Sequence, residues 1–111
     1  DDRSPCAYSV EGEEYVGKKM VKDFDGVLYW GQVMGFLAQE KNSPKTFAVV
    51  YHDGDREELE VDELKKGVAR AAKATVGDTQ TAKLHERLKQ RVKTWMDERE
   101  RELDRAAARD R

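Results

Sequence analysis

The sequence predicts a mainly β fold: a small antiparallel β-barrel over residues 15–66, followed by a long C-terminal α-helix. Runs of β-branched and aromatic residues alternate with tight-turn signals up to residue 61. Two isolated glycines, Gly31 and Gly35, interrupt the longest of these runs, which indicates a bend or bulge. Beyond residue 78, apolar residues recur with the spacing of a helix.

The first 14 residues carry no periodic signal. Residues 1–14 are polar and contain Pro5 and Gly12, so we expect a flexible arm, with ordered structure beginning near Tyr15. The one cysteine, Cys6, cannot form an internal disulfide, which favours a reducing compartment. Because the chain begins at Asp1 rather than at methionine, we expect a piece of a longer protein.

Four strand signals follow in order. The first, "YVGKKMVKDF", leads into a turn at Asp25-Gly26, and the second is the long run "VLYWGQVMGFLA". After a polar loop over residues 39–45, the third is "TFAVVYH". The turn "DGD" at 53–55 then leads into "REELEV". These signals predict a four-stranded antiparallel arrangement.

A short helical segment is expected after the strands. Asp62 can cap its start and Gly67 can end it, which gives about one turn, and residues 67–77 read as a linker or short helix. Four strands and one such turn in about fifty residues describe an SH3-like barrel. A generic β-meander remains the alternative from periodicity.

Residues 78–111 predict a charged amphipathic helix, with Asp78 or Thr79 as its cap and one continuous run from Thr79 to about Ala107. Its apolar stripe should dock on the barrel or on another protein, with Trp30 packed beneath it. The docking residues are Leu84, Leu88, Val92 and Trp95. A basic run between Lys83 and Lys93 leaves contact with nucleic acid open, although a solvated face is favoured.

No catalytic or metal-binding set is visible in the sequence. His52 and His85 are far apart, and no cysteine or histidine spacing suits a metal. No glycine-rich phosphate loop is present. We therefore expect neither an enzyme nor a cofactor. No apolar run approaches the roughly 18 residues needed to span a bilayer, so we expect no membrane partner.

The aromatic residues near the two predicted turns suggest a binding site. Phe24, Tyr29 and Tyr51 can line one shallow pocket if both turns lie at the same end of the barrel. Aromatic faces attract cations such as methylated ammonium, and Asp53 and Asp55 are placed to add charge at the rim. The segment 53–63 holds seven acidic residues, which suits a basic peptide. We expect Tyr51 to face solvent, so that its loss would leave the fold intact.

Two stretches of the strand region resemble a known protein family. "DGVLYWGQV" and "VVYHDGDREEL", within a stretch from Val16 to about Leu64, resemble the Tudor domains of the Royal superfamily, especially those of plant and algal chromatin-associated proteins. The resemblance implies a five-stranded SH3-like barrel that reads methyl-lysine or methyl-arginine through an aromatic cage. By position it assigns cage aromatics to Tyr29 and Tyr51 and a cation contact to Asp55.

This sequence departs from the family pattern at two cage positions. The first-strand position falls near Lys22 or Asp23, and Phe24 fills it only with a small shift. The fourth position falls on Gly54–Glu57, where no aromatic stands. We therefore expect a cage of two or three walls.

Two functions follow from the resemblance. The first is a non-catalytic reader of a methylated basic peptide, such as a histone tail, in the nucleus. The second is a non-reading Tudor-fold scaffold that docks into a larger assembly through barrel and helix.

Overall fold

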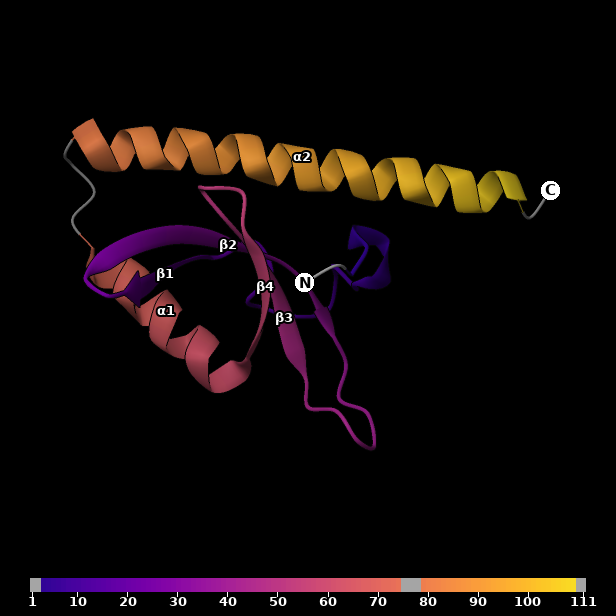
Figure 1. Cartoon of the computed structure of the whole chain (residues 1–111). Coiled ribbons are helices and arrows are strands. Elements are labelled where there is room, and N and C mark those ends of the chain that lie inside the picture. Colours follow the sequence, from indigo (N-terminus) through magenta and orange to yellow (C-terminus); the bar gives the residue numbers. More distant parts are fainter. Residues whose placement is uncertain (1–2, 75–78, 110–111) are drawn as a thin grey trace.

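The computed structural model describes residues 3–74 and 79–109. Four antiparallel strands form one curled sheet in the order β1-β2-β3-β4: β1 (Lys19–Phe24), β2 (Val27–Leu37), β3 (Thr46–Tyr51) and β4 (Arg56–Glu60). Two helices follow, α1 (Val61–Lys73) and α2 (Thr79–Arg109) (Figure 1). The predicted fold class, an SH3-like antiparallel sheet followed by a long C-terminal helix, is confirmed. The family pattern implied five strands, and the described residues form four.

The turns and bends lie where the glycines predicted them. Asp25 and Gly26 have φ values of 52° and 81°, and two positive φ values match the twist of a hairpin. The pairing of β2 with β3 shifts register between Val33 and Gly35, which marks a bulge. A Cβ at Gly35 would lie 2.8 Å from the Ser9 carbonyl oxygen, so the glycine also lets the N-terminal segment approach.

The sheet has an apolar cluster on each face. The inner cluster lies within the curl of the sheet and against α1; it comprises Met20, Val33, Phe47, Val49, Tyr51, Leu59 and Leu64. The outer cluster lies between the sheet, the N-terminal segment and α2; it comprises Tyr8, Val21, Trp30, Met34, Ala48, Val50, Leu88 and Trp95. Adjacent residues on a strand point to opposite faces, so Tyr29 and Trp30 serve different clusters.

Helix α1 is longer than the sequence predicted. It begins at Val61, with Glu60 rather than Asp62 at the N-cap, and continues through Gly67 to Lys73. Gly67 does not end the helix, because its missing side chain serves packing instead. A Cβ there would lie 2.5 Å from Met20 Cε and 3.2 Å from the Val21 carbonyl oxygen. The glycine therefore lets α1 pack closely against β1.

The prediction of a flexible N-terminal arm is wrong for its described residues. Pro5–Ala7 form a 3-10 turn, and Ser9 pairs with Phe36 at the edge of β2. Tyr8 is 5% exposed, and its ring centroid lies 6.3 Å from that of Trp95. Burial of this ring offsets the entropy lost on ordering the segment.

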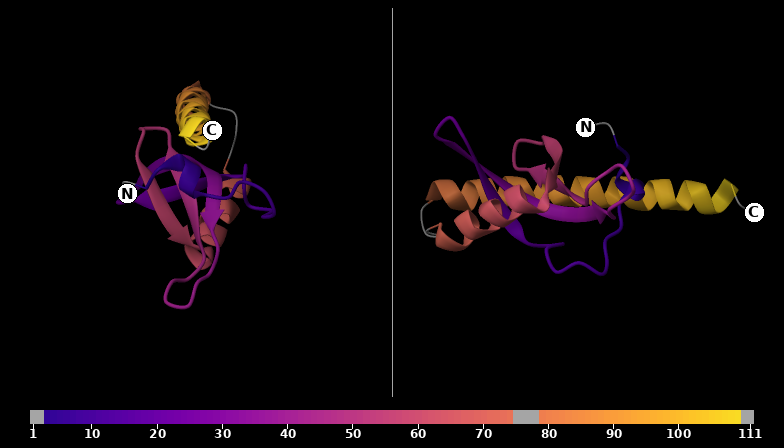
Figure 2. Two further views of the ribbon diagram at one scale, coloured as in Figure 1. Left: turned by 90° about the vertical axis from the view of Figure 1, so that its right-hand side faces the viewer. Right: turned by 90° about the horizontal axis from the view of Figure 1, so that it is seen from below.

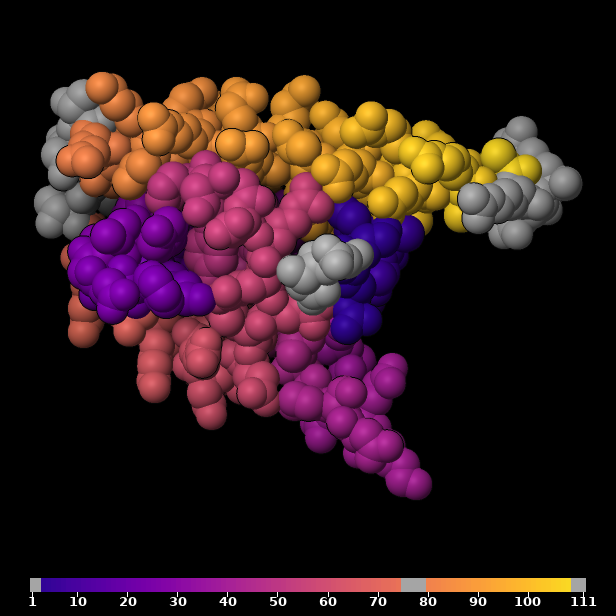
Figure 3. All heavy atoms as spheres, viewed as in Figure 1, coloured from indigo at the N-terminus to yellow at the C-terminus, as the bar shows by residue number. Residues whose placement is uncertain are grey.

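Helix α2 lies across the outer face of the sheet and extends past it toward the C-terminus (Figures 1 and 2). It is continuous from Thr79 to Arg109, slightly beyond the predicted end near Ala107. The predicted cap Asp78 and the predicted boundary between residues 77 and 78 lie outside the described residues. The space-filling view shows its first part in contact with the body of the molecule (Figure 3). Neither described helix combines the length and the apolar character needed to cross a bilayer.

The four helix residues predicted to dock lie against this chain's own sheet. Leu88 and Trp95 are buried at 1% and 3% exposure, while Leu84 and Val92 are partly buried against the same cluster. Trp30 is 4% exposed, and the His85 ring lies edge-on to it at 4.4 Å. Trp30 thus packs under α2, on the face of the sheet opposite Tyr29.

Candidate cation-binding pocket

A pocket of about 260 Å³ opens beside the two turns. It contains all five residues that the sequence suggested for a methylated cation, together with three charged neighbours. The lining residues are Lys22, Phe24, Tyr29, Tyr51, Asp53, Asp55, Arg56 and Glu57. The structure therefore brings the β1–β2 and β3–β4 turns to one end of the sheet, as the aromatic set required.

The aromatic walls come from three strands. The Tyr29 and Tyr51 ring centroids are 6.5 Å apart, and the planes are nearly perpendicular at 77°. Phe24 ends β1 and is 58% exposed, so it forms an outer wall. The His52 ring stacks on Tyr29, with the ring centroids 5.7 Å apart and an angle of 19° between the planes. The sequence did not predict this stacking, although His52 directly follows Tyr51.

Tyr51 lies in the core and does not face solvent as expected. It is 3% exposed, and its phenol O–H donates to Glu57 Oε1 at 2.8 Å. Burial raises the pKa of this phenol, and the hydrogen bond to the carboxylate raises it further. Gly31 makes room for the ring, because a Cβ there would lie 2.9 Å from Tyr51 Cδ1. Tyr51 is thus a rigid wall that also supports the fold.

The turn over residues 53–55 places the acidic rim. The Asp53 carboxylate accepts a hydrogen bond from the Asp55 N–H at 3.0 Å, and Gly54 has a φ of 96°. Within the described residues, neither Asp53 nor Asp55 pairs with a lysine or arginine. Their charge remains available to a ligand that carries a positive charge.

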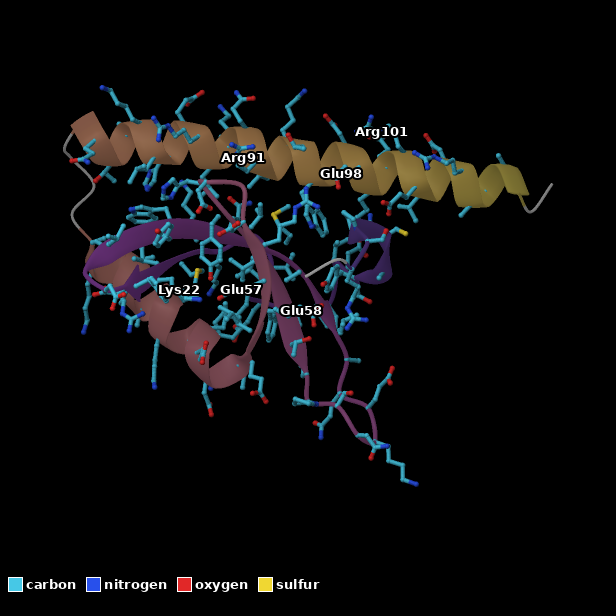
Figure 4. All side chains as sticks on the ribbon, in the orientation of Figure 1. Lys22, Glu57, Glu58, Arg91, Glu98 and Arg101 are labelled. Atoms are coloured by element: carbon cyan, nitrogen blue, oxygen red, sulfur yellow. The ribbon has the colours of Figure 1, made fainter. Side chains whose placement is uncertain are left out.

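Helix α2 supports this rim from behind. Arg56, the first residue of β4, donates two hydrogen bonds of 3.0 Å to the Glu98 carboxylate. The Arg91 guanidinium lies against Gly54, where an added Cβ would be 3.2 Å from Cζ. Figure 4 shows Arg91 and Glu98 on the side of α2 that faces the β3–β4 turn. Arg56 is therefore paired with a carboxylate of α2 rather than with the acidic residues of the rim.

Lys22 is the pocket residue whose role the sequence did not reveal. Its ammonium donates to both oxygens of Glu57, at 2.8 and 2.9 Å. It also lies 6.0 Å from the centre of the Tyr51 ring. Lys22 pairs with Tyr29 across the β1–β2 hairpin, which places the Lys22 side chain in the pocket. The position of the hairpin turn in the sequence could have indicated this register.

No cluster of metal-binding side chains stands out in the described residues. They contain no group of three histidine, cysteine or acidic side chains that could hold a metal ion. The pocket instead offers aromatic faces and carboxylates, which suit recognition of a cation. The fold and the pocket together define an SH3-like β module with a pocket lined by aromatic and charged residues.

Comparison with known families agrees with this class. Residues 17–67 match the family model described as "PTM/DIR17-like, Tudor domain", and the four-stranded curled sheet fits a Tudor-type, SH3-like fold. No curated protein and no solved structure matches the chain significantly. The matched segment contains all four strands and the first half of α1. Tudor domains are in general non-catalytic modules that bind proteins or peptides.

Proposed function

We propose that this chain is a non-catalytic reader that binds a basic peptide through a methylated lysine or arginine. The observation that carries the proposal is the convergence of Phe24, Tyr29 and Tyr51 with the two rim carboxylates on one pocket. A methylated ammonium keeps its charge but is poorly hydrated, so aromatic faces attract it at a small desolvation cost.

The acidic surroundings favour a partner rich in lysine and arginine. Asp53 and Asp55 form the rim, and the acidic run continues along β4 and into α1. A histone tail in the nucleus is the partner that we propose, because it combines dense positive charge with methylation. This choice of partner rests on the charge pattern and on the Tudor domain.

The scaffold alternative has less support from the geometry. In that alternative the chain docks into an assembly through the barrel and α2, and the helix residues named for docking include Leu88 and Trp95. Leu88 and Trp95 are instead buried against the sheet of this same chain. The reader hypothesis is therefore preferred.

The test uses a pocket residue whose loss spares the core. Phe24 is 58% exposed, and Phe24→Ala should weaken binding of a trimethyl-lysine peptide about two- to fivefold, the range for an exposed cation–π contact. Leu28→Ala is the matched control, because Leu28 is 48% exposed on the same hairpin but does not line the pocket. Isothermal titration calorimetry at fixed salt gives both affinities.

The comparison with an unmethylated peptide decides the outcome. We expect wild-type protein to bind the methylated peptide more tightly and Leu28→Ala to match wild type. Equal affinities for the two peptides would mean attraction by the acidic rim alone, and the reader proposal would fall.

A further inference from the structure

We propose that Lys22 is a built-in competitor for the cation pocket. Its ammonium occupies the inner side of the pocket and must leave Glu57 before an external methylated cation can reach Tyr51. The proposal rests on the reader function and concerns the regulation of that same site. In this proposal Lys22 lowers the affinity of the pocket for a methylated peptide.

The contacts of the Lys22 ammonium are those expected of a bound cation. The nitrogen lies 2.8 and 2.9 Å from the two Glu57 oxygens and 6.0 Å from the Tyr51 ring centre. A cation within about 6 Å of a ring centre is in the range of cation–π attraction. The pocket thus already holds one positive charge between a carboxylate and an aromatic face.

The pair also spans the open side of the sheet. Lys22 lies on β1 and Glu57 on β4, and these are the two edge strands in the order β1-β2-β3-β4. Figure 4 shows the two side chains next to each other, between the strands that carry them. The ion pair therefore joins strands that share no backbone pairing, at the place where a ligand would enter between them.

The Glu57 carboxylate already has hydrogen-bond partners within the chain. Its Oε1 accepts from the Lys22 ammonium and from the Tyr51 phenol, each at 2.8 Å. A trimethylated ammonium has no N–H and cannot replace the hydrogen bonds of Lys22. An incoming cation consequently meets Asp53 and Asp55 first, and it gains Glu57 and the Tyr51 face only when Lys22 turns outward.

The side chains are accessible enough for that movement. Lys22 and Glu57 have relative side-chain exposures of 35% and 31%. Ion pairs that are partly exposed are weak, and loss of this competitor should tighten ligand binding roughly fivefold. Removal of any nearby lysine also makes the domain more acidic, so the test needs a charge-matched control.

The experiment compares Lys22→Met with Lys41→Met and Lys22→Arg. Lys41 is exposed on the β2–β3 loop and does not line the pocket, so its variant removes the same charge without the competitor. The probes are a short basic peptide with one trimethyl-lysine and its unmethylated twin, titrated by calorimetry at matched salt. Circular dichroism checks folding, and Lys22→Ala replaces Lys22→Met if the latter does not fold.

We expect Lys22→Met to bind the methylated peptide roughly fivefold more tightly than Lys41→Met does. Lys22→Arg keeps a cation in place and should remain near wild type. Equal affinities for Lys22→Met and Lys41→Met would overturn the competitor role, even if the methylated peptide is still preferred.

A tighter Lys22→Met that does not distinguish the two peptides would support competition and overturn the reader function. Failure of every variant to bind either peptide would overturn both proposals.

Discussion

Tyr51→Ala tests whether the pocket wall is also a core residue. The ring is 3% exposed and packs in the inner cluster, so its removal should cost about 3–5 kcal/mol, the range for a large buried aromatic. A domain of this size is stable by about 5–15 kcal/mol, so the variant should lose a large share of its stability. Weaker peptide binding by Tyr51→Ala would then reflect partial unfolding as well as a lost wall.

Tyr51→Phe separates the two roles. It keeps the ring and removes the hydrogen bond to Glu57, which should cost about 1 kcal/mol because Glu57 is partly exposed and can regain water. Urea denaturation followed by circular dichroism measures both variants. With a slope of about 1–3 kcal/mol per molar, the midpoint of Tyr51→Ala should fall by about 2 M. A Tyr51→Ala midpoint within error of wild type would refute the assignment of Tyr51 to the core.

Two further predictions concern α2. Trp95→Ala should lower the free energy of unfolding by about 3–5 kcal/mol in urea titrations, because Trp95 is 3% exposed. Met96→Ala is the control, and it should cost well under half as much because Met96 is 57% exposed. Equal losses for the two variants would contradict the packing of α2 on the sheet. His85 should make stability depend on pH. Burial beside Trp30, with a smaller effect of Lys19, lowers the pKa of His85 below the ordinary value of about 6.5. Below that pH the unfolded chain therefore binds more protons than the folded chain. Stability should be full above about pH 6.5 and fall as the pH drops toward the lowered pKa, and a His85→Gln variant with the same pH profile in thermal melts would exclude His85 as the cause.

The strands and the long helix could be predicted because their signals are local. Alternation, the Asp25-Gly26 turn and the helical stripe each depend on residues close in sequence. The five suggested site residues line one pocket for the same reason, since both turns and the strand lengths are set locally. Their role in binding a methylated cation remains a prediction.

The features that the sequence did not predict depend on contacts between distant segments. Gly67 resembles a helix stop until Met20 is known to lie against it. The N-terminal segment has the composition of a flexible arm, but it is ordered because Tyr8 packs on Trp95, which is 87 positions further along the chain. Tyr51 is expected to face solvent at the end of its strand, but its ring is buried because Gly31 has no side chain to block it.

Strand alternation explains how one small sheet can hold a binding pocket and a long helix at once. Tyr29 turns inward to the pocket, and the next residue, Trp30, turns outward to α2. The helix therefore covers the outer face without covering the aromatic walls. It still reaches the pocket at the rim, where Glu98 holds Arg56 and Arg91 lies against Gly54. These contacts join α2 to the turn that carries Asp53 and Asp55, so a ligand bound as proposed would meet a rim that is already packed against the helix.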